Sequence, residues 1–148
     1  MQGLMRFIIE FVIFRVYDFI QFLRDFWQVC IRRLHKVVLR ERTGDLAPPA
    51  DVSRAAIVAI YPSEASLPFT INLLRSLVTA GCYVLLISTR RLSDTASAQL
   101  LQHCHYLIER AAVGRDFGSY KLGLQWLEGA PERFRTVDTL VLANDSLF

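Results

Sequence analysis

The chain has 148 residues, a formal net charge of +3 and a hydrophobic share of 53%, which is enough for one core of ordinary size. Residues 1–54 carry nine Arg and Lys against six Asp and Glu, whereas residues 55–148 carry eight of each kind. This distribution argues against nucleic-acid binding and favours an anionic surface, such as acidic lipid, as the partner of the first segment. The three cysteines are odd in number and set in apolar sequence, which argues against a disulfide scaffold and indicates a reduced, cytoplasmic compartment.

Residues 1–42 are predicted to form one amphipathic helix, because apolar residues recur at helical spacing on one side with charged and amide residues opposite. The charges of Glu10, Arg15 and Asp18 interrupt the run of about 20 apolar residues that a spanning helix needs. Two interpretations stay open: a helix lying in a membrane surface, or a helix packed on a partner or on another part of the protein. Residues 43–53 contain paired prolines and are predicted to be a linker.

Apolar strands then alternate with helices over residues 55–148. Strands are expected at Ala55 to Tyr61, Cys82 to Ser88, Tyr106 to Glu109 and Thr139 to Ala143. Pro68 is expected in the first turn of the first helix, Gly81 at its left-handed end, and Ser93 as the cap of the second helix. The pattern predicts an α/β, Rossmann-like parallel sheet, covered on both faces and joined by right-handed crossovers, with strand order 3-2-1-4.

Polar residues follow the carboxyl ends of these strands, where ligands bind in open α/β sheets. They are Tyr61, then Ser88 and Thr89, then Arg115, Asp116 and Lys121, and finally Asn144 and Asp145. Glycines in the third group let the backbone approach a ligand closely, so a phosphate-bearing ligand fits this edge. No dinucleotide fingerprint and no P-loop follows the first strand, which argues against nicotinamide chemistry and ordinary nucleotide hydrolysis.

Two motifs carry a resemblance to a known family. They are Gly114-Arg115-Asp116-Phe117-Gly118-Ser119-Tyr120-Lys121-Leu122-Gly123-Leu124 and Leu142-Ala143-Asn144-Asp145-Ser146. Together they resemble the rhamnan synthesis protein F family of bacterial glycosyltransferases, over roughly residues 55–148. The resemblance implies a Rossmann-like, GT-A-like donor half that transfers a sugar, rhamnose from dTDP-rhamnose, to a glycan or lipid-linked acceptor in cell-surface polysaccharide synthesis. Combined with an N-terminal helix lying in a membrane surface, it predicts a cytoplasmic protein that is peripheral at the inner face of the bacterial cell membrane.

The residues expected to contact the sugar-nucleotide donor are Tyr61, Arg115, Asp116, Gly118, Lys121, Asn144 and Asp145. By the same resemblance Asp145 would hold a divalent cation, Mg²⁺ or Mn²⁺, against the diphosphate, while the catalytic residues stay unidentified. Alternatively, Asp116 is the N-cap of the helix that follows it, and the ring of Tyr61 packs in the core instead of stacking on a nucleobase.

The sequence departs from the family at Ala112, where relatives often have an asparagine, and it stops at Phe148 whereas the family continues. We therefore expect a truncated member that is inactive by itself. The alternative function is a noncatalytic, membrane-tethered Rossmann-like interaction module or a decayed fragment.

Overall fold

The computed structural model describes residue 20 and residues 38–63, 66–112 and 114–145, and it separates the chain into two units, Met1–Lys36 and Val37–Phe148. The predicted amphipathic helix therefore lies outside the described residues, apart from Ile20 and the end that reaches residues 38–42. Within the described residues, none of the helices has the length and apolar character that crossing a membrane requires.

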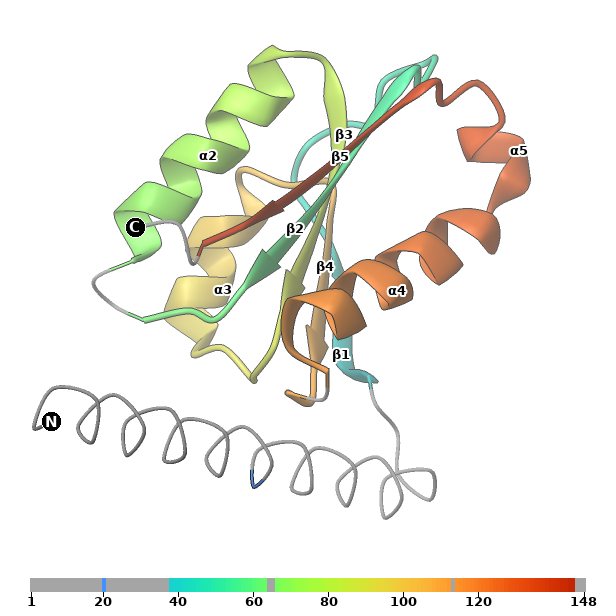
Figure 1. Ribbon diagram of the computed structural model, residues 1–148. Helices are drawn as coiled ribbons and strands as arrows, with labels where there is room; N and C mark the ends of the chain where they lie inside the picture. Colours follow the sequence, from blue (N-terminus) through green and yellow to red (C-terminus); the bar gives the residue numbers. More distant parts are fainter. Residues whose placement is uncertain (1–19, 21–37, 64–65, 113, 146–148) are drawn as a thin grey trace, which may run out of the picture. The chain divides into compact units, whose positions relative to one another are not determined.

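The second unit is built on a five-stranded sheet (Figure 1). Its strands are β1 (Val38–Thr43), β2 (Arg54–Ile60), β3 (Cys82–Ser88), β4 (Tyr106–Arg110) and β5 (Thr139–Asn144), in the order β1-β4-β3-β2-β5. The fold class is α/β as predicted, but the strand order differs from the predicted one because an unforeseen strand, β1, adds an antiparallel edge beside β4. The four expected strands are parallel to one another and lie side by side in the order β4, β3, β2, β5.

Strand β1 corrects the prediction that residues 1–42 form a single helix, because residues 38–43 pair with β4. Side chains along β1 alternate between half-buried and exposed, the period of two that a strand requires. Arg40 and Arg42 lie on the half-buried side, where their guanidinium groups reach Asp94. The sequence analysis had placed both arginines in the helix predicted over residues 1–42.

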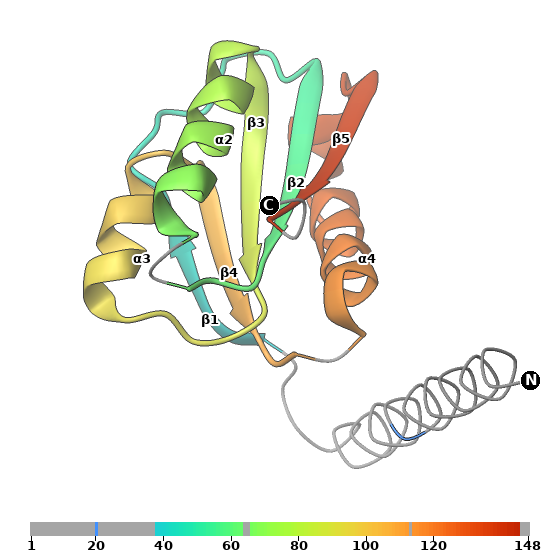
Figure 2. The same cartoon turned by 60° about the vertical axis from the view of Figure 1, so that its left-hand side comes forward.

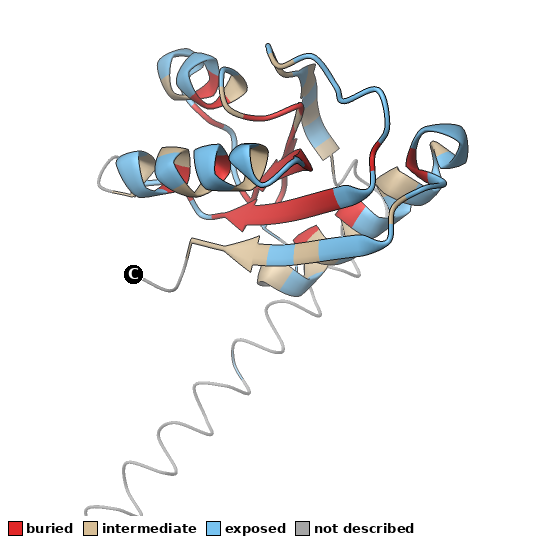
Figure 3. Ribbon diagram, turned by 90° about the horizontal axis from the view of Figure 1, so that it is seen from above, coloured by how far each residue is buried: buried red, intermediate tan, exposed pale blue. Residues whose placement is uncertain are grey.

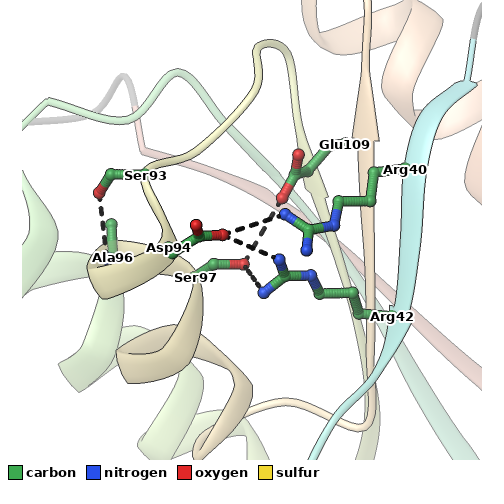
Figure 4. Close-up of polar contacts among 7 residues, drawn as sticks. All are labelled: Arg40, Arg42, Ser93, Asp94, Ala96, Ser97 and Glu109. Atoms are coloured by element: carbon green, nitrogen blue, oxygen red, sulfur yellow. Dashed lines mark hydrogen bonds and ion pairs between the residues drawn. The ribbon is translucent and has the colours of Figure 1, made fainter.

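Helices α2 (Leu67–Thr79) and α3 (Asp94–Leu101) cover one face of the sheet, and α4 (Arg115–Glu128) covers the other (Figure 2). A short helix, α5 (Pro131–Phe134), follows α4. The predicted signals are confirmed: Pro68 lies in the first turn of α2, Gly81 follows that helix with a φ of 78°, and Ser93 Oγ accepts the amide hydrogen of Ala96. The same hydrogen bond of Ser93 is drawn in Figure 4.

The two faces of β2 build separate cores, because alternate residues of a strand point to opposite sides. Ala56, Val58 and Ile60 pack with α2 and α3, whereas Ile57 packs under α4. Helix α4 approaches this face closely at Gly123, where an added Cβ would lie 2.7 Å from the Ile57 side chain. Strand β2 is buried almost throughout, in contrast to β5, as Figure 3 shows.

Candidate functional site

The candidate site lies at the carboxyl ends of β2 and β5, beside the start of α4. Strands β3 and β4 continue the sheet on one side of β2, and the chain then returns through α4 and α5 to place β5 on the other side. This reversal is the position at which open α/β sheets form their ligand crevice. The structure therefore gathers residues of both sequence motifs at one edge, as the sequence predicted.

Asp145 is held against the end of β2. Both of its carboxylate oxygens accept the backbone N–H of Tyr61, at 3.0 and 3.1 Å, and the Asp145 amide donates to the carbonyl of Ala59. Burial raises the pKa of the Asp145 carboxyl, hydrogen bonds from the backbone oppose that rise, and the negative charge of Asp116 adds to it. The site thus holds two acids close enough to influence each other.

Asp116 contacts the second motif directly. Its Oδ2 accepts a hydrogen bond of 2.7 Å from the side-chain amide of Asn144. The alternative that Asp116 is the N-cap of its helix is wrong, because the cap is Gly114, with a φ of 71°, and Asp116 lies within the first turn. Gly114 is needed there because a residue with a Cβ adopts that left-handed conformation at a cost.

Tyr61 is 61% exposed, so the alternative that its ring packs in the core is wrong. The guanidinium carbon of Arg90 lies 5.1 Å from the centre of this ring, within cation–π range. Stacking of Tyr61 on a nucleobase stays a prediction. Sequence reasoning missed Arg90, although a pair of arginines directly after an apolar strand was the signal that could have shown it.

The other predicted residues are less closely joined to the acids. Gly118 lies in the first turns of α4, where its N–H donates to the Gly114 carbonyl at 2.8 Å. Lys121 is exposed one turn further along, and Arg115 is the first residue of α4, with its side chain outside what the structure describes. Ser88 and Thr89 are buried and serve the fold, since Thr89 Oγ1 donates to the Ile60 carbonyl and Ser88 Oγ donates to the Arg90 carbonyl.

Arg110, at the end of β4, is a buried cation that the sequence analysis did not single out. It is 2% exposed, and its Nη1 donates to the hydroxyl of buried Ser119 in α4 at 3.0 Å. Burial lowers the pKa of its guanidinium, which nevertheless stays charged at neutral pH. This contact explains the serine of the first motif as the anchor that holds α4 on the end of β4.

The oxygen ligands at this site suit a divalent cation that takes its remaining ligands from a bound substrate. Mg²⁺ is commonly held by one or two carboxylates together with phosphate oxygens and water. Asp145 and Asp116 provide two carboxylates, and Asn144 fixes the orientation of the second. Within the described residues no group of three or more His, Cys, Asp or Glu side chains gathers as a metal-binding cluster.

The chain is similar to uncharacterized protein y4gN of Sinorhizobium fredii (strain NBRC 101917 / NGR234), with 28% identity over 132 residues. The similarity covers 85% of this chain and 33% of the relative, so the chain spans about a third of the length of the protein it matches. No family model matches the chain, and no solved structure matches it.

Proposed function

We propose that this chain is the donor-binding domain of a glycosyltransferase of the rhamnan synthesis type, with dTDP-rhamnose as the donor. The acceptor in this proposal is a glycan or lipid-linked sugar at the inner face of the bacterial cell membrane. In this proposal the acceptor site is formed by elements outside this domain, since the chain spans about a third of the length of the relative that it matches. The proposal rests on the sequence resemblance together with one structural observation, the hydrogen bond between Asp116 of the first motif and Asn144 of the second.

The state of Asp145 supports a binding role. Its carboxyl is partly buried, and its pKa is raised by that burial and by the nearby Asp116, so its charged form is disfavoured in the folded chain. Acids kept in such an unfavourable setting at a sheet edge are typical of functional sites. In this proposal Asp145 holds Mg²⁺ or Mn²⁺, whose positive charge neutralises the diphosphate of the donor.

The test is calorimetric titration of dTDP-rhamnose, in the presence of Mg²⁺, into the chain and its Asp145→Asn variant. Asparagine keeps the shape of the side chain and its Oδ1 can still accept the Tyr61 N–H, so the fold is retained while the charge is lost. We expect the affinity to fall at least about tenfold, the loss of one charge-assisted contact.

The matched control is Asp138→Asn, which removes the same charge just before β5, at the opposite end of that strand from Asp145. We expect this variant to bind the donor as the unaltered chain does. Absence of donor binding by the unaltered chain, or equal binding by the Asp145 variant, would refute the proposed function.

A second candidate function is a noncatalytic interaction module. It is favoured by one observation, namely that Asp116 and Asp145 already hydrogen-bond within the domain and thereby tie β5 and α4 to β2. In that case both carboxylates act as structural ties, and neither Mg²⁺ nor sugar nucleotide should protect the chain against thermal unfolding.

A further inference from the structure

A pocket of about 290 Å³ opens at the carboxyl ends of β2 and β3, between the starts of α2 and α3. Its polar lining comes from Ser63 after β2 and from Arg90, Arg91 and Ser93 after β3. Small-molecule sites usually measure about 300–1,000 Å³, so this volume suits a small group better than a whole nucleotide. Neither Arg91 nor this pocket belongs to the candidate site described above.

The described lining of the pocket carries positive charge. Among the described residues that line it, two are arginines and none is acidic. Guanidinium groups present planar, paired N–H donors that match phosphate oxygens bidentately. Both arginines are exposed and both line the pocket, so one ligand can contact the two guanidinium groups.

Asp94 is the described acid nearest to Arg91 along the sequence, and it does not line the pocket. Its Oδ1 accepts hydrogen bonds from Arg40 Nη1 at 3.2 Å and from Arg42 Nη2 at 3.1 Å. Figure 4 shows the carboxylate pointing toward β1 and its two arginines. The acid is thereby paired with β1, and the charged residues that line the pocket are Arg90 and Arg91.

We propose that this pocket binds a phosphate or diphosphate group through Arg90 and Arg91. The proposal stands on the pocket itself and does not require that the chain bind a sugar nucleotide. The contact of Arg90 with the exposed ring of Tyr61 joins the pocket to the candidate site, so one diphosphate-bearing ligand can touch both.

The experiment is a calorimetric titration with two probes, inorganic pyrophosphate and thymidine diphosphate, each used separately. The proteins are the 148-residue chain, the single variants Arg90→Gln and Arg91→Gln, and the double variant. We expect the double variant to lose at least about tenfold in affinity for both probes, the loss of two charge-assisted contacts. Tighter binding of thymidine diphosphate than of pyrophosphate would identify a nucleotide as the source of the group. Equal binding would identify phosphate alone as the recognised group.

The control is Arg135→Gln. It removes one positive charge, as each single variant does, from an exposed arginine that lies beside α5 and away from this pocket. It should leave both affinities unchanged, and thermal melting should show that all variants fold. The proposal is overturned if the unaltered chain binds neither probe, if the double variant binds as tightly as the unaltered chain, or if Arg135→Gln weakens binding as much. Pyrophosphate binding that depends on Arg90 and Arg91, without any binding of dTDP-rhamnose, would refute the proposed function and support this pocket.

Discussion

The two edges of the sheet are finished in opposite ways. At one edge β1 carries charged residues, is fixed by two arginines to Asp94, and continues into Gly44, whose N–H donates to the His105 carbonyl. At the other edge β5 has no charged residue in its span, and Leu140 and Leu142 are 40% and 48% exposed. Lysine and other charges on an edge strand discourage pairing with another chain, so β1 is protected and β5 is not.

The difference shows where this domain is closed and where it is open to contacts. Residues of β5 alternate between Val141 and Ala143, which face α2, and the two exposed leucines, which face the side of α4. Helix α4 lies over β2 and β3 and leaves those leucines uncovered. The open edge is also the one that carries Asn144 and Asp145.

The largest effect is expected at the closed edge, from Gly44→Ala. An added Cβ would overlap the carbonyl oxygen of Cys104, so β1 and the loop before β4 must separate. We expect a loss of roughly 2–4 kcal/mol in the free energy of unfolding, measured by urea denaturation. Gly129→Ala is the control, because its φ of −69° is ordinary and its Cβ would meet nothing closer than 3.4 Å. Equal stability of the two variants would show that β1 is not tightly fixed.

The open edge is tested by Leu142→Lys against Leu39→Lys, which alter leucines of similar exposure, 48% and 52%, on the two edge strands. We expect the chain to self-associate through β5 and to be poorly soluble. A lysine at residue 142 should weaken that association about tenfold or more, roughly 1.4 kcal/mol, whereas the lysine on β1 should not. Sedimentation over a range of concentrations measures both, and an unaltered chain that stays a monodisperse monomer would contradict the expectation.

Acid should loosen the closed edge through His105. Its Nδ1 accepts the backbone N–H of Val84 at 3.0 Å, and burial, with a smaller effect of Arg133, lowers the pKa of the imidazole. Because the unfolded chain takes up the proton first, this stability is complete above the ordinary histidine pKa of about 6.5 and is lost as the pH falls below it. Loss of the hydrogen bond should cost about 1 kcal/mol.

Thermal melting between pH 7 and pH 5 checks this with a His105→Asn variant, whose Oδ1 can accept the same N–H at any pH. The variant should lose part of the acid sensitivity, while the control His103→Asn, altered at the neighbouring histidine whose pKa is also lowered by burial, should keep the part due to His105. An unaltered pH dependence in His105→Asn would assign the sensitivity to another group.

The smallest effect is expected from Asp145→Asn on stability. A raised pKa means that the ionised carboxyl is disfavoured in the folded chain, so the fold loses stability as the pH rises above the ordinary aspartate pKa of about 3.9. Removal of the charge should therefore leave the melting temperature at pH 7 unchanged or slightly raised. A marked drop would show that the carboxylate is mainly a structural tie between β5 and β2.

The parallel strands could be predicted from the sequence because each is a continuous apolar run bounded by local turn signals. Strand β1 could not, because its partner in β4 lies more than 60 residues away and its arginines match a helix pattern equally well. The gathering of Asp116 and Asn144 at one edge followed from the general behaviour of parallel sheets. Their hydrogen bond, and the placing of the N-cap at Gly114, depend on how α4 crosses the sheet and have no local signal.

The antiparallel direction of β1 has a mechanical consequence. Val38 pairs with Arg110 at the carboxyl end of β4, so Val38 lies at the same end of the sheet as Asn144, although β1 and β5 are its two opposite edge strands. Tension applied between residues 38 and 144 acts across the strands, along their hydrogen bonds, and not lengthwise. Such a load opens the pairs of β1 and β4 one after another from Val38, which takes less force than sliding a whole strand past its neighbour.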